Sequence, residues 1–555
     1  MPPRMTPDAP SKVTDMTANT TESFDYVVVG GGSAGAIVAA RLSEKPGVRV
    51  CLLEAGPADK HPFLHIPAGF IKVIFDPNFT WGYETEPGPA IDGRKLPVIQ
   101  GKVLGGGGSI NGMVWVRGQR EDYDGWAQEG NPGWSFDDIL PHYLKIERRI
   151  GEGDPAFRGR GGPVPVMDLA WKNGLVEAFI ASAEREGIPY NADYNGAEQT
   201  GVGRYQYNID RGRRYSAARG YLRGAAGRSN LVVRTDAMAR EILFDGARAT
   251  GIRYRMKGAS GDRTVTARRE VILCAGAVNT PRLMMLSGLG PGEHLAEHGI
   301  SVRRDLPGLG ENYQDHYTPR LTYRAKNVAT INGVARGPRL LGQIANWALG
   351  RPSVIGMGVV LGAAFWKTRP ELERPNIVVT FTPGTFKAGF LGRLDDFPGM
   401  TTGVWQLRPD SRGTVRLRSA DPDAKPVIQP NFLADEGDQR VVVEALKIAR
   451  RIMAQPQMLA LTEAETMPGL DKSSDDELLA YSRAQGLCGY HSSGTARMGP
   501  QSNPRAVVDA RLRVHGVPGL RIVDASIMPV VVSGNTNAAT MMIAEKGAEM
   551  ILQDA

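Results

Sequence analysis

Cysteine is scarce in this sequence, since its 555 residues include only Cys51, Cys274 and Cys488. A small, odd number argues against a disulfide framework, and no CxxC or Cys/His spacing suits a metal ion. His294 and His298 would fall on one helical face, but no third ligand accompanies them. We therefore expect no metal site, and a reducing compartment, which favours a cytoplasmic protein.

Long hydrophobic runs are also missing, because no stretch reaches 18 consecutive apolar residues. The chain is therefore predicted to contain no transmembrane segment. Residues 1–21 have no apolar run either, and are predicted to form a disordered leader and not a secretory signal. The segment 338–365 is unusually apolar. We expect a buried helix and a strand there, with contact to a membrane surface as the alternative.

A strong excess of one charge is absent as well: 66 basic and 59 acidic residues give a net charge of +7. The basic residues are scattered in short groups such as Arg211–Arg214, without a long stripe, so no nucleic-acid partner is expected. A composition of 42% hydrophobic and 23% charged residues supports a core and excludes wholesale disorder. The length predicts more than one domain.

Two kinds of strand pattern are present. Residues 24–29 and 48–53 are apolar and enclose a helical stretch over 34–43, which predicts a strand–helix–strand unit of a parallel sheet. Further along, alternating runs at 377–381 and 414–419 predict a half-buried antiparallel sheet. The predicted fold class is therefore α/β with a Rossmann-like domain, combined with a second domain built on an antiparallel sheet.

The first strand leads into a dinucleotide-binding fingerprint, Gly30-Gly-Gly32-Ser-Ala-Gly35, and Glu54 closes the next strand. Gly30 permits the tight turn, Gly32 lets the backbone approach a pyrophosphate, and Gly35 lets the helix pack on the strand. The helix N-terminus favours phosphate, and Glu54 can accept hydrogen bonds from a ribose. The predicted cofactor-binding residues here are Gly30, Gly32, Ser33, Ala34, Gly35, Glu54 and Ala55.

Further motifs carry a family resemblance. They are Gly101-Lys-Val-Leu-Gly-Gly-Gly-Gly-Ser-Ile-Asn111, the stretches 276–290 and 307–316, His491-Ser-Ser-Gly-Thr495, and the stretch 524–538. In this order they resemble the glucose–methanol–choline (GMC) flavin oxidoreductases, in the style of bacterial sorbose, alcohol, choline and polyethylene glycol dehydrogenases. The resemblance implies FAD, where the fingerprint alone leaves NAD or FAD open.

The resemblance also implies a discontinuous architecture. The FAD-binding domain would comprise residues 22–160, 220–316 and 490–555, and the substrate-binding domain residues 161–219 and 317–489. Members with covalent flavin typically place a histidine where this chain has Ser109-Ile110-Asn111, so FAD is expected to be non-covalent.

The remaining cofactor contacts are also implied by the resemblance. Glycine density near residue 105 would let the backbone lie flat against the isoalloxazine ring. A helix over 538–548 would aim its N-terminus at the flavin and stabilise the reduced anion. Trp81 matches a family aromatic, although an ordinary core tryptophan explains it equally well. The full set is Trp81, Val103, Gly108, Asn111, Gly112, Met113, Val114, Asp524, Ala525, Thr536 and Asn537.

Two residues are implied to be catalytic. His491 matches the family's base, which takes the hydroxyl proton while the α-hydrogen passes as hydride to flavin N5. Asn535, 44 residues on, would hydrogen-bond the substrate oxygen. The alternative for Asn535 is a cap for the following helix. His316, in a family loop motif, is expected to be structural.

The predicted function is FAD-dependent oxidation of a primary or secondary alcohol to an aldehyde or ketone. A neutral polar alcohol such as a polyol or sugar is favoured, unless Trp347 and Phe365 wall the pocket and select an aliphatic or aromatic one. The alternatives are a choline-type dehydrogenase or oxidase, with Glu311 as candidate acid, or a hydroxynitrile-type lyase. The electron acceptor (oxygen, a quinone or a dye) and the oligomeric state are left open.

Overall fold

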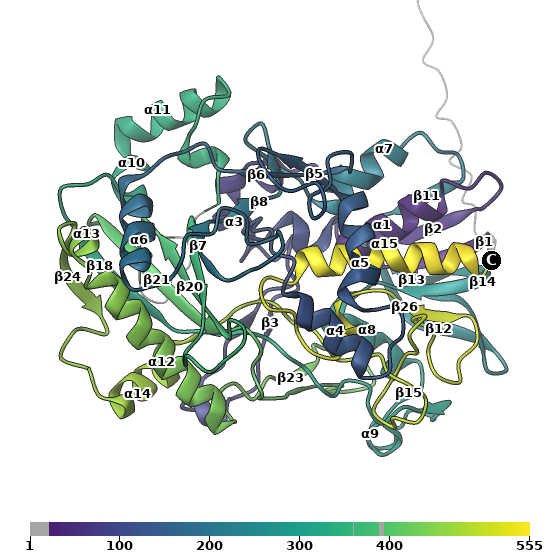
Figure 1. Ribbon diagram of the computed structural model, residues 1–555. Helices are drawn as coiled ribbons and strands as arrows, with labels where there is room; N and C mark the ends of the chain where they lie inside the picture. Colours follow the sequence, from purple (N-terminus) through teal and green to yellow (C-terminus); the bar gives the residue numbers. More distant parts are fainter. Residues whose placement is uncertain (1–21, 359, 388–392) are drawn as a thin grey trace, which may run out of the picture.

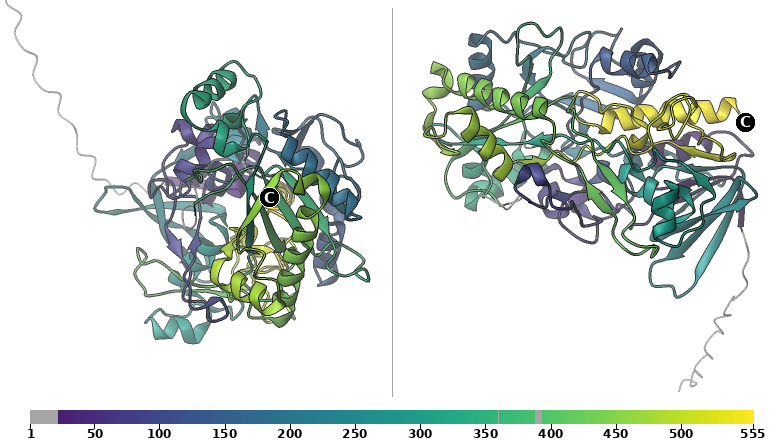
Figure 2. Two further views of the ribbon diagram at one scale, coloured as in Figure 1. Left: turned by 90° about the vertical axis from the view of Figure 1, so that its left-hand side faces the viewer. Right: turned by 90° about the horizontal axis from the view of Figure 1, so that it is seen from below.

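The structure, a computed structural model, describes residues 22–358, 360–387 and 393–555 (Figure 1). The predicted leader lies outside this range. Two large sheets lie towards opposite ends of the molecule in Figure 1 and in the right-hand view of Figure 2, and the left-hand view of Figure 2 looks onto one of these ends. Among the described residues, no helix is long and apolar enough to cross a membrane.

The first sheet is seven-stranded, and its strands come from distant parts of the chain. Its order is β11-β2-β1-β14-β13-β12, and β26 also pairs with β14. β1, β2, β11, β14 and β26 run parallel, and β12 and β13 add an antiparallel ribbon. The bounds are β1 (Glu22–Val29), β2 (Val50–Leu53), β11 (Leu231–Arg234), β12 (Ala237–Asp245), β13 (Arg248–Met256), β14 (Asp262–Leu273) and β26 (Leu520–Ile522).

Two helices from opposite ends of the chain pack together beside this sheet. α1 (Ser33–Leu42) follows the glycine turn, and α15 (Asn537–Gln553), yellow in Figure 1, lies against it. α15 is buried nearly all round, as its Ala- and Met-rich sequence predicts. Its buried Glu545 is paired with Arg41 (2.8 Å) and Lys145 (2.7 Å), which offsets the cost of burying a charge.

The second sheet is six-stranded and antiparallel, in the order β24-β18-β21-β20-β19-β7. Helices α12 (Glu436–Met453) and α6 (Gly174–Arg185) cover one of its faces. The bounds are β24 (Thr462–Met467), β18 (Arg320–Ala325), β21 (Gly399–Gln406), β20 (Ile377–Thr382), β19 (Gly362–Trp366) and β7 (Gly201–Arg204). Fold class and sheet types are as the sequence predicts.

Two details of the antiparallel prediction were wrong. β20 is buried on both faces and not on one, because helices cover one side and the cavity described below lies on the other. β22 (Thr414–Arg416) pairs only with β23 (Val427–Gln429), next to α8 (Gly276–Leu286), and not with the large sheet. Alternation of apolar and polar residues indicates a half-exposed strand, and such a strand occurs in a two-stranded ribbon as well as in a large sheet.

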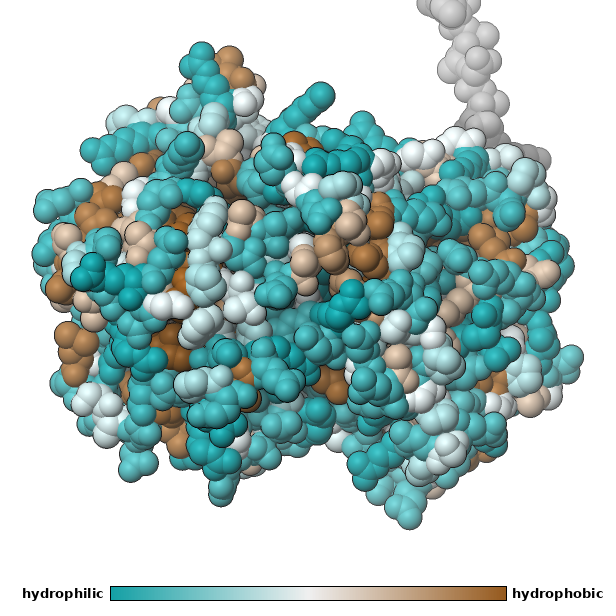
Figure 3. Space-filling view, in the orientation of Figure 1, coloured by the Kyte–Doolittle hydropathy of each residue, from teal (hydrophilic) through white to brown (hydrophobic). Residues whose placement is uncertain are grey.

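The prediction that the helix in 338–365 is buried was also wrong. α11 (Gly337–Ala348) projects from the body and has no buried residue, with Leu341 69% exposed (Figures 1 and 3). It is held by Trp347, whose Nε1 donates to the carbonyl of Gly212 (2.7 Å). The strand of this segment, β19, is buried as expected.

The domain boundaries stay a prediction. A three-stranded sheet of β5 (Glu147–Ile150), β6 (Val164–Asp168) and β8 (Gln206–Tyr207) joins the two sides of the expected boundary at 160/161. Other elements used below are α3 (Phe70–Val73), β17 (Tyr317–Thr318) and β25 (Leu487–Cys488).

Candidate active site

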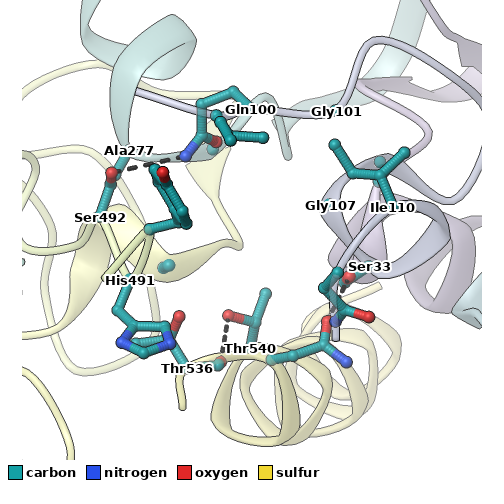
Figure 4. A pocket seen from close by; sticks show the side chains of 18 of the residues that line it. Ser33, Gln100, Gly101, Gly107, Ile110, Ala277, His491, Ser492, Thr536 and Thr540 are labelled. Carbon is teal, nitrogen blue, oxygen red and sulfur yellow. Dashed lines mark hydrogen bonds between the residues drawn. The ribbon is translucent and has the colours of Figure 1, made fainter. Parts of the chain in front are cut away.

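A cavity of about 450 Å³ is lined by residues from both large sheets. Figure 4 shows it between His491 on one side and Ser33 and Ile110 on the other. The end near the parallel sheet is walled by glycine turns and the start of α15, and the other end by β17, β18, β20 and β21. The two ends differ in chemistry.

Two glycine loops meet at the first end. Gly30 has φ +97°, and a Cβ there would lie 2.5 Å from the carbonyl oxygen of Cys274. A Cβ on Gly35 would lie 1.8 Å from the Gly30 oxygen, so helix and strand approach closely. A Cβ on Gly106 would lie 2.7 Å from Gly32 Cα. The wall is therefore bare backbone, which can approach a flat or phosphate-bearing ligand.

Glu54 lies at the end of β2, beside the first glycine loop. Its Oε2 accepts a hydrogen bond from the Gly31 N–H and its Oε1 one from the Gly56 N–H, both at 2.7 Å. Burial raises the pKa of Glu54 to about 7, although the two hydrogen bonds act to lower it. Each carboxylate oxygen keeps a lone pair, so Glu54 can still accept from a ribose hydroxyl.

Asp524 follows β26 and lines the same end, but its oxygens are fully used by the protein. Oδ2 accepts from Gly276 N–H (2.8 Å) and Thr280 Oγ1 (2.6 Å), and Oδ1 accepts from the N–H (2.8 Å) and hydroxyl (2.6 Å) of Ser526. Burial raises its pKa, and these four donors act against the shift. Asp524 therefore fixes the start of α8 against the wall.

The N-terminus of α15 faces the cavity through Thr536, Asn537 and Thr540 (Figure 4). Ser33 Oγ donates to Asn537 Oδ1 (2.7 Å), which ties the starts of α1 and α15 together. Asn537 Nδ2 is buried and has no hydrogen-bond partner among the described residues. Two helix N-termini and a free donor in one place favour an anionic ligand.

Arg214 is a buried cation behind the second glycine loop that the sequence analysis missed. Its Nη1 donates to the Gly108 carbonyl (3.2 Å) and Asn111 Oδ1 (2.7 Å). Its Nε and Nη2 have no partner in the described part of the chain, and burial lowers its pKa to about 9. Arg214 does not line the cavity, so it supports the loop around Gly108 and Asn111 from behind. No local motif marks Arg214, because its neighbours lie about a hundred residues away in sequence.

Most predicted cofactor residues line the cavity. They are Gly30, Gly32, Ser33, Ala34, Glu54, Ala55, Trp81, Asn111, Gly112, Met113, Val114, Asp524, Ala525, Thr536 and Asn537. Gly35, Val103 and Gly108 do not line it. Gly35 faces Gly30, and Val103 is fully buried in a side cluster. A Cβ on Gly108 would lie 2.9 Å from Ser33 Oγ, so this glycine serves loop packing.

The predicted catalytic residues meet in the cavity. His491 Nε2 lies 2.8 Å from Asn535 Nδ2, although the two residues are 44 positions apart. Asn535 Oδ1 is buried without a partner among the described residues. The alternative that Asn535 caps α15 was wrong, because the N-cap is Thr536 and no side chain caps this helix.

His316, which the sequence analysis expected to be structural, lies in direct contact with His491. Its Nε2 lies 2.9 Å from the Leu407 carbonyl, which can only accept, so Nε2 carries the hydrogen. Burial lowers the pKa of His316 to about 4, so the ring is neutral and its Nδ1 is an acceptor. This nitrogen lies 2.8 Å from His491 Nδ1, which must therefore carry a hydrogen.

This chain of hydrogen bonds sets the tautomer of His491. With a hydrogen on Nδ1, the neutral ring presents the lone pair of Nε2 towards Asn535. Burial, and to a lesser degree His316, lower the pKa of His491 well below its ordinary value. His491 is therefore an unprotonated base at neutral pH.

Asp315 holds both histidines in place through their backbones. Its Oδ1 accepts the N–H of His491 (2.7 Å) and of His316 (2.8 Å). Its Oδ2 accepts from Cys488 Sγ (3.1 Å), Tyr313 Oη and Ser492 Oγ (both 3.2 Å). Burial raises its pKa to about 6 despite these donors.

The end near the antiparallel sheet is mixed polar and apolar. It is lined by Thr318, Arg320, Val360, Thr380, Thr382, Phe386, Thr401, Gly403, Trp405 and Tyr490. Trp347 and Phe365, which the sequence analysis offered as walls only in its alternative reading, do not line it. Phe365 shares the face of the sheet with Val378 and Trp405, but it packs with Tyr194 and Tyr205 outside the cavity. Glu311, the candidate acid for choline, is outside the cavity and pairs with Arg416.

One end of the cavity has glycine turns and two helix N-termini beside a parallel sheet, and the other side has a histidine–asparagine pair. This combination is typical of an oxidoreductase that uses a dinucleotide cofactor. Family models described as GMC oxidoreductase match residues 24–318 and 409–544. The chain belongs to the GMC oxidoreductase family, which uses FAD and acts on CH–OH groups.

Relatives agree with this assignment over nearly the whole chain. An alcohol dehydrogenase (acceptor) of Pseudomonas putida is 40% identical over 532 residues, which cover 96% of each chain. An oxygen-dependent choline dehydrogenase of Escherichia coli O17:K52:H18 is 40% identical over 538 residues, 95% of each. Pyridoxine 4-oxidase from Mesorbium loti has a TM-score of 0.85 and 30% identity, over 95% of this chain and 98% of its own.

Proposed function

We propose that this protein oxidises a primary alcohol to the aldehyde, with FAD as a non-covalent cofactor, His491 as base and Asn535 as the residue that orients the alcohol oxygen. The observation that carries the proposal is the 2.8 Å contact between His491 Nε2 and Asn535 Nδ2 inside the cavity. It puts a proton acceptor and a hydrogen-bond donor side by side, as removal of a hydroxyl proton requires.

The residues divide the work as follows. The alcohol hydroxyl replaces the hydrogen bond between Asn535 Nδ2 and His491 Nε2, so that the lone pair of Nε2 receives its proton and the amide N–H donates to its oxygen. The Nδ1–H of His491 remains hydrogen-bonded to His316 Nδ1, and the Nε2–H of His316 remains hydrogen-bonded to the Leu407 carbonyl. Bound FAD supplies the acceptor for the hydride that leaves the alcohol carbon. The start of α15 favours negative charge nearby.

Non-covalent attachment is supported by the side chain at position 110. Ile110 lines the cavity and has no nucleophile, and the neighbouring Ser109 hydroxyl is buried and donates to the Leu104 carbonyl (2.8 Å).

Choline is the second substrate class suggested by the relatives, at the same identity as an alcohol dehydrogenase. A quaternary ammonium group calls for an acid or an aromatic cage. The acids among the described cavity residues are Glu54 and Asp524, both at the cofactor end. The other end has the aromatic residues Phe386, Trp405 and Tyr490, but it also carries Arg320, which would repel a cation. The cavity therefore supports an alcohol without a positive charge.

The test is anaerobic reduction of the purified yellow protein. We expect alcohols to bleach its flavin absorbance, and turnover to follow when oxygen or an artificial dye is added. A protein whose oxidised flavin is unchanged by a broad panel of alcohols would contradict the proposal and favour the lyase alternative.

A further inference from the structure

One cation on the floor of the cavity, Arg320, has no side-chain partner among the residues that the structure describes. Arg320, in β18, lies directly opposite Gly403 of β21, and Gly403 lies opposite Thr380 of β20. Residues that face each other across a sheet share a face, so these three project to one side. All three line the cavity. The intervening residues, such as Leu321, belong to the core on the face covered by α12.

Gly403 has no side chain, so it leaves space on this face of the sheet next to Arg320. A Cβ at Gly403 would lie 3.0 Å from Thr380 Oγ1 and 3.8 Å from Arg320 Cγ. Thr380 Oγ1 already donates to the Gly403 carbonyl (3.0 Å), so it does not need Arg320 as a partner.

The guanidinium makes no ion pair and donates no hydrogen bond within the described chain, unlike Arg324 on the same strand, which lies 3.9 Å from Glu463. Burial lowers the pKa of Arg320, and only the phenols of Tyr490 and Tyr481 act in the other direction. Arg320 is half-buried, and an unpaired charge that has lost part of its hydration is costly to a folded protein. The cost is offset if a bound ligand forms an ion pair with the guanidinium.

Two more donors near Arg320 also lack partners. Tyr490 Oη and Trp405 Nε1 are buried and without a hydrogen bond among the described residues. Both line the cavity, Tyr490 directly precedes His491, and the Trp405 ring lies 6.1 Å from the His491 ring. This end of the cavity therefore has unpaired hydrogen-bond donors, and no carboxylate lines it among the described residues. These features favour a ligand with an anionic acceptor.

We propose that Arg320 binds a carboxylate at the far end of the substrate, so that the enzyme oxidises the hydroxyl of a hydroxycarboxylic acid. The planar guanidinium matches a carboxylate through two parallel hydrogen bonds. The inference rests on the proposed alcohol oxidation, since His491 must act on the other end of the same molecule. It replaces the neutral polyol or sugar expected from the sequence.

The experiment compares a homologous series of ω-hydroxycarboxylates with their methyl esters, which keep the hydroxyl and lose the charge. For the holoenzyme we expect kcat/KM to favour the best carboxylate over its ester by at least about tenfold, or about 1.4 kcal/mol. In Arg320→Gln and Arg320→Leu this preference should disappear. Arg324→Gln, a matched change on the same strand outside the cavity, should keep it.

A second measurement does not depend on turnover. Simple alkanoates should inhibit competitively and more strongly than the corresponding alkanamides, and Arg320→Gln should remove the difference. Equal or better kcat/KM for the esters, together with equal inhibition by alkanoates and alkanamides, would overturn the inference and leave alcohol oxidation standing. Failure of every alcohol to reduce the flavin would instead refute the proposed function.

Discussion

His316 Nδ1 and His491 Nδ1 lie 2.8 Å apart, so two imidazoles 175 residues apart in sequence share one hydrogen. The Leu407 carbonyl decides which ring donates, because it accepts from the opposite nitrogen of His316. A main-chain carbonyl outside the cavity thus keeps the lone pair of His491 on Nε2, where the proposed mechanism needs it.

Loss of the base should remove catalysis and spare the cofactor. His491→Ala is expected to bind FAD and to lose about 10²-fold or more in the rate of flavin reduction, since a positioned base contributes about 10²–10⁴. Asn535→Ala should be milder, because it orients the alcohol and does not take its proton. Rapid anaerobic mixing measures both rates. His515→Ala, whose ring contacts the Gly499 carbonyl outside the cavity, is the control. Reduction of the His491 variant at the wild-type rate would refute the assignment.

His316 should act as a positioning residue. In His316→Leu the Nδ1–H of His491 and the Leu407 carbonyl both lose their partner, so the tautomer of His491 is no longer fixed. We expect kcat/KM to fall by about 10–10²-fold, with partial recovery in His316→Gln, which keeps an acceptor and a donor. ¹⁵N chemical shifts of the imidazole rings report the tautomer directly. An unchanged His491 spectrum in His316→Leu would disprove this role.

The pH profile should have one acidic limb. Burial lowers the pKa of His491 well below its ordinary value, so the base is already free at pH 6.5. Asp315 has a pKa raised to about 6, and its protonation would put a hydrogen on Oδ2, where three donors converge, so activity is lost as pH falls through about 6. We expect kcat/KM to be flat above this limb. A limb near pH 7.5 or above would mean that His491 titrates there instead.

Asp315→Asn should affect both stability and rate. An amide would place an NH₂ group where an oxygen now accepts from two donors (Oδ1) or three donors (Oδ2), and loss of a buried charge–hydrogen-bond network costs about 3 kcal/mol of unfolding free energy. Asp438→Asn is the matched control, because Asp438 is equally buried and accepts the N–H groups of Asp410 and Ser411 away from the cavity. Urea unfolding should show losses in both variants. Only Asp315→Asn should lower kcat and remove the acidic limb.

FAD should leave the denatured protein completely. Since Ile110 offers no nucleophile, acid precipitation is expected to release all yellow colour into the supernatant. Absorbance at the flavin maximum in pellet and supernatant measures this. Colour that remains in a washed pellet would establish a covalent link.

The sequence predicted what short motifs encode. The glycine turn, Glu54 and the motif around His491 are local patterns, and their residues meet in the cavity. The importance of His316 and Arg320 could not be predicted in this way. His316 matters through a carbonyl 91 residues away, and Arg320 looks like any strand arginine until its lack of a partner is seen. The burial of α11 was misjudged because hydropathy cannot tell whether a neighbouring element covers a helix.

The hydrogen bond between Ser33 and Asn537 joins residues 504 positions apart, and it closes one wall of the cofactor site. During synthesis the glycine turn leaves the ribosome long before its partner exists. At roughly 5–20 residues per second, the interval is about 25 to 100 s. For that time the apolar face of α1 has no α15 to cover it. Nascent chains should therefore be most prone to aggregation, and most dependent on chaperones, until the last helix is made.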